Sequence, residues 1–172
     1  MGAVIELPLP WQMRALDRML DYKRCQVQAL AGVGTRDVQA AYLSTLLHLQ
    51  LVDRAIVICP KVLFCWWEGR SLYKTYNSVL ADRSKFDLIS SVKARQHSSF
   101  NWADIQRTAF VIDIGVSGRH TAAALNHELR AAPWVSARRM QNSALTDRDP
   151  ILVTPVPLGQ RLVMEGISVG VD

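Results

Sequence analysis

Apolar residues recur along this chain with two different periods, and the two periods alternate. Residues 11–24 and 37–51 each place apolar side chains three and four positions apart, which predicts two amphipathic helices. Residues 54–60 are apolar at nearly every position, as a central strand of a parallel sheet requires because both of its faces are buried. Shorter apolar runs predict further strands at residues 26–31, 86–90, 108–114 and 150–154.

The segments between these strands complete a pattern of alternating strands and helices. Two more helices are predicted at residues 62–73 and 122–130, polar aperiodic segments at 93–101 and 133–150, and a last strand or a tail at 161–171. Such alternation predicts an α/β domain with a mostly parallel sheet and helices on both faces. We expect a single domain over residues 1–172, with ligands bound at the carboxyl ends of the strands.

Composition and charge narrow the class of protein. Hydrophobic residues make up 49% of the chain and charged residues 20%, as in soluble globular proteins, and no apolar run is long enough to span a membrane. We therefore expect no membrane partner and an intracellular location, either cytoplasmic or in the nucleoid or nucleus. The net charge of +5 permits phosphate contacts with nucleic acid, although an ordinary basic surface has the same charge.

Cysteine and histidine residues give no metal-binding pattern. Cys25, Cys59 and Cys65 lack the spacing of metal ligands, and their apolar neighbours predict buried free thiols in a reducing compartment. His120 and His127 are seven residues apart, but no third ligand accompanies them. We expect no metal site.

A glycine-containing turn joins the first predicted strand to the second helix. Gly32 and Gly34 permit backbone angles that other residues avoid, and the free N–H groups of a following helix attract anions. This is the outline of a phosphate-binding loop, which in its working form ends in Gly-Lys-Ser or Gly-Lys-Thr. Here Thr35 and Arg36 follow Gly34. The alternative is a turn with only a structural role.

The order of these signals resembles the first RecA-like lobe of superfamily-two helicases, and most closely the bacterial branch of the Swi/Snf-type translocases. The resemblance covers residues 7–158. It is carried by residues 9–12 (an entry motif), 27–41 (the Walker A loop), 57–61 with Val62, Leu63 and Trp67 (a nucleic-acid backbone motif), 110–115 (a later strand), 125–134 (the approach to Walker B) and 151–158 (the Thr-Ala-Thr-Pro motif).

The resemblance implies a RecA-like, three-layer, P-loop-type domain with specific binding residues. Gln12 is similar to the glutamine that contacts adenine, and Gly32, Gly34, Thr35 and Arg36 fall on the nucleotide loop. Lys61 and Arg119 lie at predicted strand ends on the nucleic-acid side, with ordinary surface charge as the alternative. Arg138 and Arg139 are the densest basic pair in a predicted loop and are candidates for contact with RNA or DNA, the alternative being a solvated loop.

The departures from the family pattern fall on its catalytic residues. In one register of the loop Thr35 replaces the lysine and Arg36 the hydroxyl residue; in the other Arg36 replaces the lysine and Asp37 the hydroxyl residue. The acidic strand of Walker B is missing after Trp134, which removes the carboxylates that anchor Mg²⁺ and orient water. In the last motif Pro155 and Val156 replace a small residue and a threonine. We therefore expect a sheet that is one strand short, or one whose gap is filled by residues 161–171.

The sequence thus predicts a degenerate, catalytically inactive helicase or translocase lobe. It would act as a nucleic-acid-binding or protein-binding module in a larger assembly, with a protein partner or a second helicase lobe, no catalytic residues and no cofactor. The alternative is an ATP-binding lobe that hydrolyses ATP with Mg²⁺ once a second lobe or chain is present. In it Arg36 would replace the lysine, and Asp113 or Asp147 would replace Walker B. A third alternative is an altered or engineered derivative of a helicase.

Overall fold

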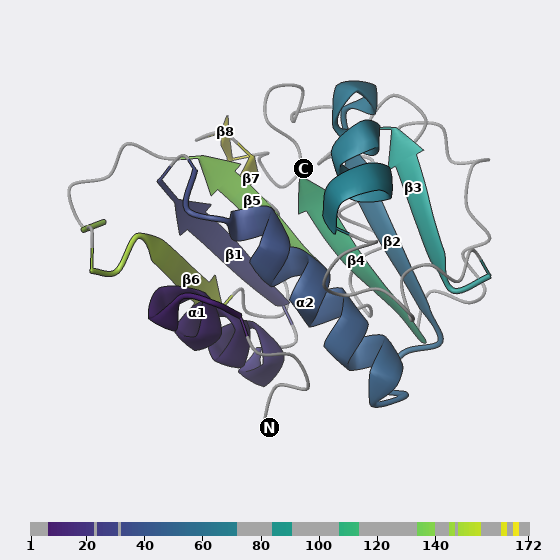
Figure 1. Ribbon diagram of the computed structural model, residues 1–172, viewed down its shortest axis with the longest axis horizontal. Helices are drawn as coiled ribbons and strands as arrows, with labels where there is room; N and C mark the ends of the chain where they lie inside the picture. Colours follow the sequence, from purple (N-terminus) through teal and green to yellow (C-terminus); the bar gives the residue numbers. More distant parts are fainter. Residues whose placement is uncertain are drawn as a thin grey trace.

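The computed structural model of this chain contains a central sheet with helices packed against it (Figure 1). The structure describes residues 7–22, 24–30, 32–71, 84–90, 107–113, 134–139, 145–146, 148–155, 163–164 and 167–168. Its helical segments are α1 (Pro10–Asp21), α2 (Thr35–His48), the 3₁₀ turn η1 (Lys61–Leu63) and the π-helix η2 (Trp66–Ser71). Its strands are β1 (Arg24–Ala29), β2 (Arg54–Cys59), β3 (Phe86–Ser90), β4 (Thr108–Asp113), β5 (Trp134–Arg139), β6 (Ile151–Pro155), β7 (Val163–Met164) and β8 (Ile167–Ser168).

The main sheet has the strand order β3-β2-β4-β5-β1-β6. The strands from β3 to β1 run parallel, whereas β6 pairs antiparallel with β1. This arrangement confirms the predicted α/β fold with a mostly parallel sheet. Because five strands point the same way, their carboxyl ends all lie at one side of the sheet, which is uppermost in Figure 1. We call this side the carboxyl edge.

Strand β5 contradicts the prediction that residues 133–150 are aperiodic loop. It lies in the interior of the sheet, where Val135 is opposite both Val111 of β4 and Cys25 of β1. Its apolar residues lie within a stretch of only four positions. A stretch this short shows no periodicity by which a strand could be distinguished from a loop. Pairing on both sides satisfies its backbone groups and holds it extended. Arg138 and Arg139 therefore end a central strand and do not lie in a loop.

The predicted gap in the sheet is filled, but not by the segment that the sequence favoured. β5 occupies the position between β4 and β1, and it contains no carboxylate. Within residues 161–171, β7 and β8 pair with each other in a separate two-stranded sheet. The expectation that residues 161–171 fill the gap was therefore wrong.

Several element boundaries differ from the predicted ones. Helix α1 ends at Asp21 because Tyr22 has an extended backbone, with φ −99° and ψ 127°. Strand β1 then begins at Arg24, two residues before the predicted start. The predicted helix at residues 62–73 is instead a 3₁₀ turn followed by a π-helix. A π-helix has more residues per turn than an α-helix and is often found at functional sites.

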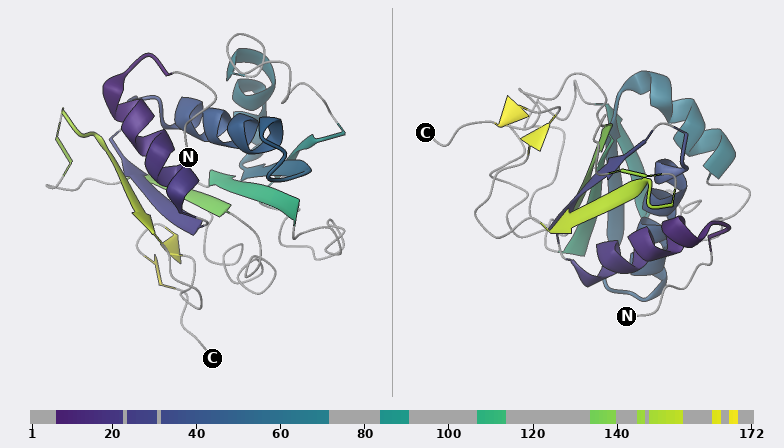
Figure 2. Two further views of the ribbon diagram at one scale, coloured as in Figure 1. Left: turned by 90° about the horizontal axis from the view of Figure 1, so that it is seen from below. Right: turned by 90° about the vertical axis from the view of Figure 1, so that its left-hand side faces the viewer.

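All helices that the structure describes cover the same face of the sheet, as the two views of Figure 2 show. Helix α2 packs on β4 and β2 and against α1 and η2, and α1 also packs on β6. The helix predicted at residues 122–130 lies outside the described residues, so the second helical layer of the predicted fold is not among the elements described here. Among the described residues, no helix combines the length and apolar character needed to cross a membrane.

Two of the three cysteines belong to the core between these helices and the sheet. Cys25 on β1 and Cys59 on β2 are buried, and burial raises the pKa of each thiol to about 12. Cys65 lies between η1 and η2 and is exposed. The expectation of buried thiols therefore holds for Cys25 and Cys59 and is wrong for Cys65.

This difference predicts how the thiols react with Ellman's reagent. At about pH 8 we expect one thiol per native chain to react rapidly, because only Cys65 is exposed and thiols with a pKa of about 12 contain almost no thiolate. All three are expected to react in denaturant. A Cys65→Ser variant should show no rapid reaction in the native state. Rapid reaction of two thiols would contradict the burial of Cys25 or Cys59.

Candidate site at the carboxyl edge of the sheet

Residues that the sequence singled out separately come together at the carboxyl edge. The glycine turn follows β1, and Lys61 follows β2. Asp113 ends β4, and Arg138 and Arg139 end β5. Since these four strands are parallel, all of these residues lie at one side of the sheet. This is the location that the sequence predicted for a ligand.

The glycine turn has the backbone that its glycines predict. Gly32 and Gly34 have φ values of 76° and 78°, in the left-handed region that favours glycine. Gly34 also precedes the first residue of α2, Thr35. The turn therefore directs the amino end of α2 toward the carboxyl edge, as in the predicted loop.

Gln12 packs beneath this turn. Its side chain is 3% exposed, and its Nε2 donates a hydrogen bond to the backbone carbonyl of Val33 at 3.4 Å. Its Oε1 accepts a hydrogen bond from the backbone N–H of Leu9 at 3.3 Å. A Cβ added to Gly34 would lie 2.2 Å from Gln12 Nε2. The amide thus links the glycine turn to the start of α1, and its burial keeps it from contacting a base in this conformation.

Arg36 and Asp113 form an ion pair across the carboxyl edge. Arg36 Nε donates a hydrogen bond to Asp113 Oδ2 at 2.7 Å. The Arg36 side chain is 38% exposed and that of Asp113 only 11%, so the pair is partly shielded from water. Burial raises the pKa of the nearby Cys59 thiol. The negative charge of Asp113 raises this pKa further, and the positive charge of Arg36 lowers it by a smaller amount. Arg36 is the candidate replacement for the lysine of the nucleotide loop, and Asp113 is a candidate replacement for the Walker B carboxylate. Because they form an ion pair, each neutralises the charge of the other.

Thr35 and Asp37 complete the first turn of α2. Thr35 takes the position after Gly34, and Asp37 lies within 3.2 Å of where a Cβ on Gly34 would be. Burial raises the pKa of the Asp37 carboxyl. A carboxylate here repels a phosphate unless a metal lies between them. Among the described residues, no group of three or more His, Cys, Asp or Glu side chains is arranged to hold a metal ion.

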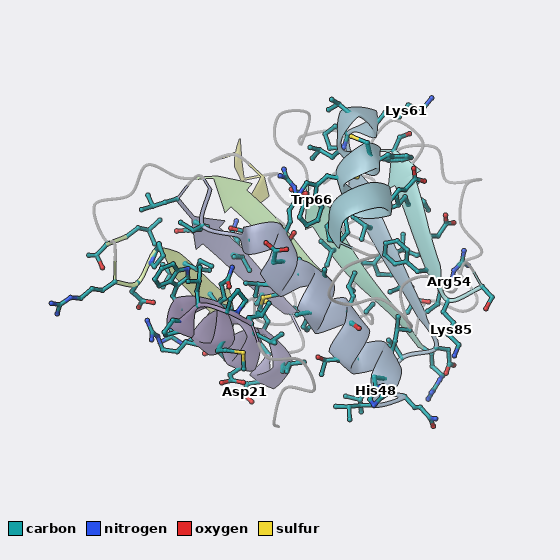
Figure 3. The ribbon with its side chains drawn as sticks, in the orientation of Figure 1. Asp21, His48, Arg54, Lys61, Trp66 and Lys85 are labelled. Atoms are coloured by element: carbon teal, nitrogen blue, oxygen red, sulfur yellow. The ribbon has the colours of Figure 1, made fainter. Side chains whose placement is uncertain are left out.

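Trp66 joins this site, although the sequence indicated only that one of the adjacent Trp66 and Trp67 is core and that the other could face a partner. Its ring lies under the Arg36 guanidinium, whose central carbon is 5.6 Å from the ring centroid. The sequence gave no sign of which of the two tryptophans contacts Arg36. Figure 3 shows Trp66 near the carboxyl edge, with Lys61 farther out on the same side of the sheet.

The remaining candidates are placed by backbone alone or lie outside the described residues. Arg138 is in register with Gln28 and Arg139 with Ala29, so both are next to the strand that leads into the glycine turn. Arg119 lies outside the described residues. The carboxyl edge thus carries Arg36, Lys61, Arg138 and Arg139, whereas the carboxylate of Asp113 is already paired.

The sequence was also compared with known proteins. No model of a known protein family matches it, and no curated protein matches it. The resemblance to a helicase lobe therefore depends on the order of motifs in the chain.

Proposed function

We propose that this chain is a RecA-like domain of helicase or translocase descent that no longer hydrolyses ATP. It acts as a nucleic-acid-binding or protein-binding module within a larger assembly. One observation carries the proposal: Arg36 and Asp113 are bonded to each other at 2.7 Å. Phosphoryl transfer requires a cation on the phosphates and a carboxylate on Mg²⁺, and each of these groups here has the other as its partner.

Two further features of the carboxyl edge support the loss of hydrolysis. The strand next to β1 ends in Arg138 and Arg139, which cannot coordinate Mg²⁺ or orient an attacking water. Gln12, the candidate for adenine contact, is buried, with one end of its amide bonded to Val33 in the glycine turn and the other to Leu9 at the start of α1. The basic residues at this edge and the net charge of +5 favour an anionic partner.

The same ion pair keeps one alternative open. Arg36 and Asp113 are a cation and a carboxylate next to a glycine turn, the groups that an ATP-binding lobe with altered residues would use. ATP with Mg²⁺ would then have to separate the pair, and a second lobe or chain would have to complete the site.

Calorimetry with ATP and Mg²⁺ distinguishes these two functions. We expect no binding heat at nucleotide concentrations up to about 1 mM, the upper end of ordinary KM values, and phosphate release no faster than without protein. A ligand present at one hundred times its Kd would stabilise the fold by about 2.7 kcal/mol, so thermal unfolding with and without ATP is a second measurement.

The Arg36→Ala variant serves as the matched control for this experiment. Binding by the wild type that disappears in Arg36→Ala, together with ATP turnover, would show that the catalytic chemistry has been rebuilt from unusual residues. That result would refute the proposal that the domain no longer hydrolyses ATP, and it would favour the ATP-binding alternative.

A further inference from the structure

Trp66 is a partly exposed aromatic ring on a rigid support. Its ring meets that of Trp67 edge to face, with centroids 5.2 Å apart and an interplanar angle of 81°. Trp67 is completely buried and packs against Phe86 on β3, with ring centroids 6.4 Å apart. Trp66 is therefore anchored to the core through its neighbour and is not a loose surface side chain.

One cation lies over this ring, and a second lies farther out at the same carboxyl edge. Arg36 lies over Trp66, and its side chain is 38% exposed although it is paired with Asp113. Lys61 is exposed and has no hydrogen-bond or ion-pair partner from its side chain in the part of the chain that the structure describes. Figure 3 shows Trp66 and Lys61 on the side of the carboxyl edge, whereas His48 and Lys85 lie on the opposite side of the sheet.

An anchored aromatic ring beside cations is the arrangement that binds single-stranded nucleic acid. Every base has a face that stacks on an aromatic ring, and the cations contact the phosphates. A duplex offers phosphates but keeps its bases stacked inside, so it gains nothing from the ring. An acidic protein surface likewise pairs with the cations and does not require an exposed ring.

We propose that the carboxyl edge binds single-stranded nucleic acid, with an unpaired base stacked on Trp66 beside Arg36 and a backbone phosphate on Lys61. This rests on the proposed function and deepens it, because it specifies a single strand as the partner. Binding requires no divalent metal, since the cations are supplied by the protein and Asp113 is already paired.

Two substitutions of Trp66 separate stacking from charge. With a fluorescently labelled oligothymidylate of about 15 nucleotides and EDTA present, we expect Trp66→Leu to weaken binding roughly ten-fold, because Leu fills space but cannot stack. Trp66→Phe should remain within about three-fold of the wild type, since it keeps an aromatic ring. Binding of duplex DNA of equal length should be weaker than that of the single strand and unchanged by either substitution.

Two lysines at opposite sides of the sheet provide a matched control. Lys61→Ala should reduce the slope of log affinity against log salt by about 0.7, the value expected for one phosphate contact on a single strand. Lys85→Ala removes the same charge from the opposite side, as Figure 3 shows, and should leave affinity and slope unchanged.

The outcomes separate this inference from the proposed function. Equal weakening by Lys61→Ala and Lys85→Ala, unchanged binding by Trp66→Leu, or no binding of the single strand would overturn the inference. Any of these results leaves the absence of ATP hydrolysis untouched. ATP turnover would refute the proposed function whatever the nucleic-acid results.

Discussion

Replacing Gly34 by Ala is expected to lower the free energy of unfolding by about 2–4 kcal/mol. A left-handed backbone costs a residue with a Cβ about 1–2 kcal/mol, and Gly34 has a φ of 78°. The new Cβ would also lie 2.2 Å from Gln12 Nε2, which is held by hydrogen bonds at both ends of its amide. Relief of this contact requires Gln12 to leave Val33 or the start of α1. Urea unfolding followed by tryptophan fluorescence measures the loss.

Gly32 is the matched control for this substitution. It has nearly the same φ, 76°, but a Cβ added there has no neighbour within 4 Å. Gly32→Ala should therefore cost only about 1 kcal/mol, the backbone contribution alone. If the contact with Gln12 causes most of the difference, Gly34→Ala should become much milder in a Gln12→Ala background, with only the contact to Asp37 Oδ2 at 3.2 Å remaining. Equal costs for the two glycines in the wild-type background would show that Gln12 does not hold the turn.

Replacing Arg36 by Ala is expected to lower the free energy of unfolding by about 2–3 kcal/mol. Asp113 is 11% exposed, so the loss of Arg36 leaves a largely buried carboxylate without its cation. Breaking a buried ion pair from one side costs about 3–5 kcal/mol, and the partial exposure of Arg36 reduces this value. Asp113→Asn should cost less, about 1 kcal/mol, because Arg36 stays partly in water and over the ring of Trp66.

The double variant and an exposed ion pair test this explanation. Arg36→Ala combined with Asp113→Asn should be more stable than the sum of the two losses predicts, by about 1–2 kcal/mol, because no unpaired carboxylate remains. Arg54 and Asp87 form an ion pair at 3.3 Å with side chains 40% and 47% exposed. Arg54→Ala should therefore cost less than about 0.5 kcal/mol. Additive losses for Arg36 and Asp113 would show that the two side chains are not coupled.

Hydrophobic periodicity predicted most of the described elements and part of the candidate site. The strand at residues 54–60 and the strand Phe86–Ser90 were found nearly as predicted, because a continuous apolar run between polar segments is a local signal. Gly32 and Gly34 predicted the turn because only glycine takes a left-handed backbone without cost. Once the strands were known to be parallel, the position of Lys61 at the carboxyl edge followed.

The candidate site itself could not be predicted to the same extent. Arg36 and Asp113 are 77 residues apart, and no local pattern indicates that they touch. Asp113 was considered as a substitute for a missing carboxylate, but its pairing with Arg36 was not foreseen. The contact between Gln12 and Val33 spans 21 residues and likewise requires the folded arrangement of α1 and the turn.

The amino-acid sequence by itself determined the alternation of helices and strands, the parallel character of the sheet and the glycine turn, because each depends on side chains close together in the chain. Only the tertiary structure decided that residues 134–139 form a strand, because a segment with three apolar residues becomes extended there through hydrogen bonds to β4 on one side and β1 on the other. It also decided that Arg36 faces Asp113, since this ion pair exists only when α2 lies across the carboxyl end of β4.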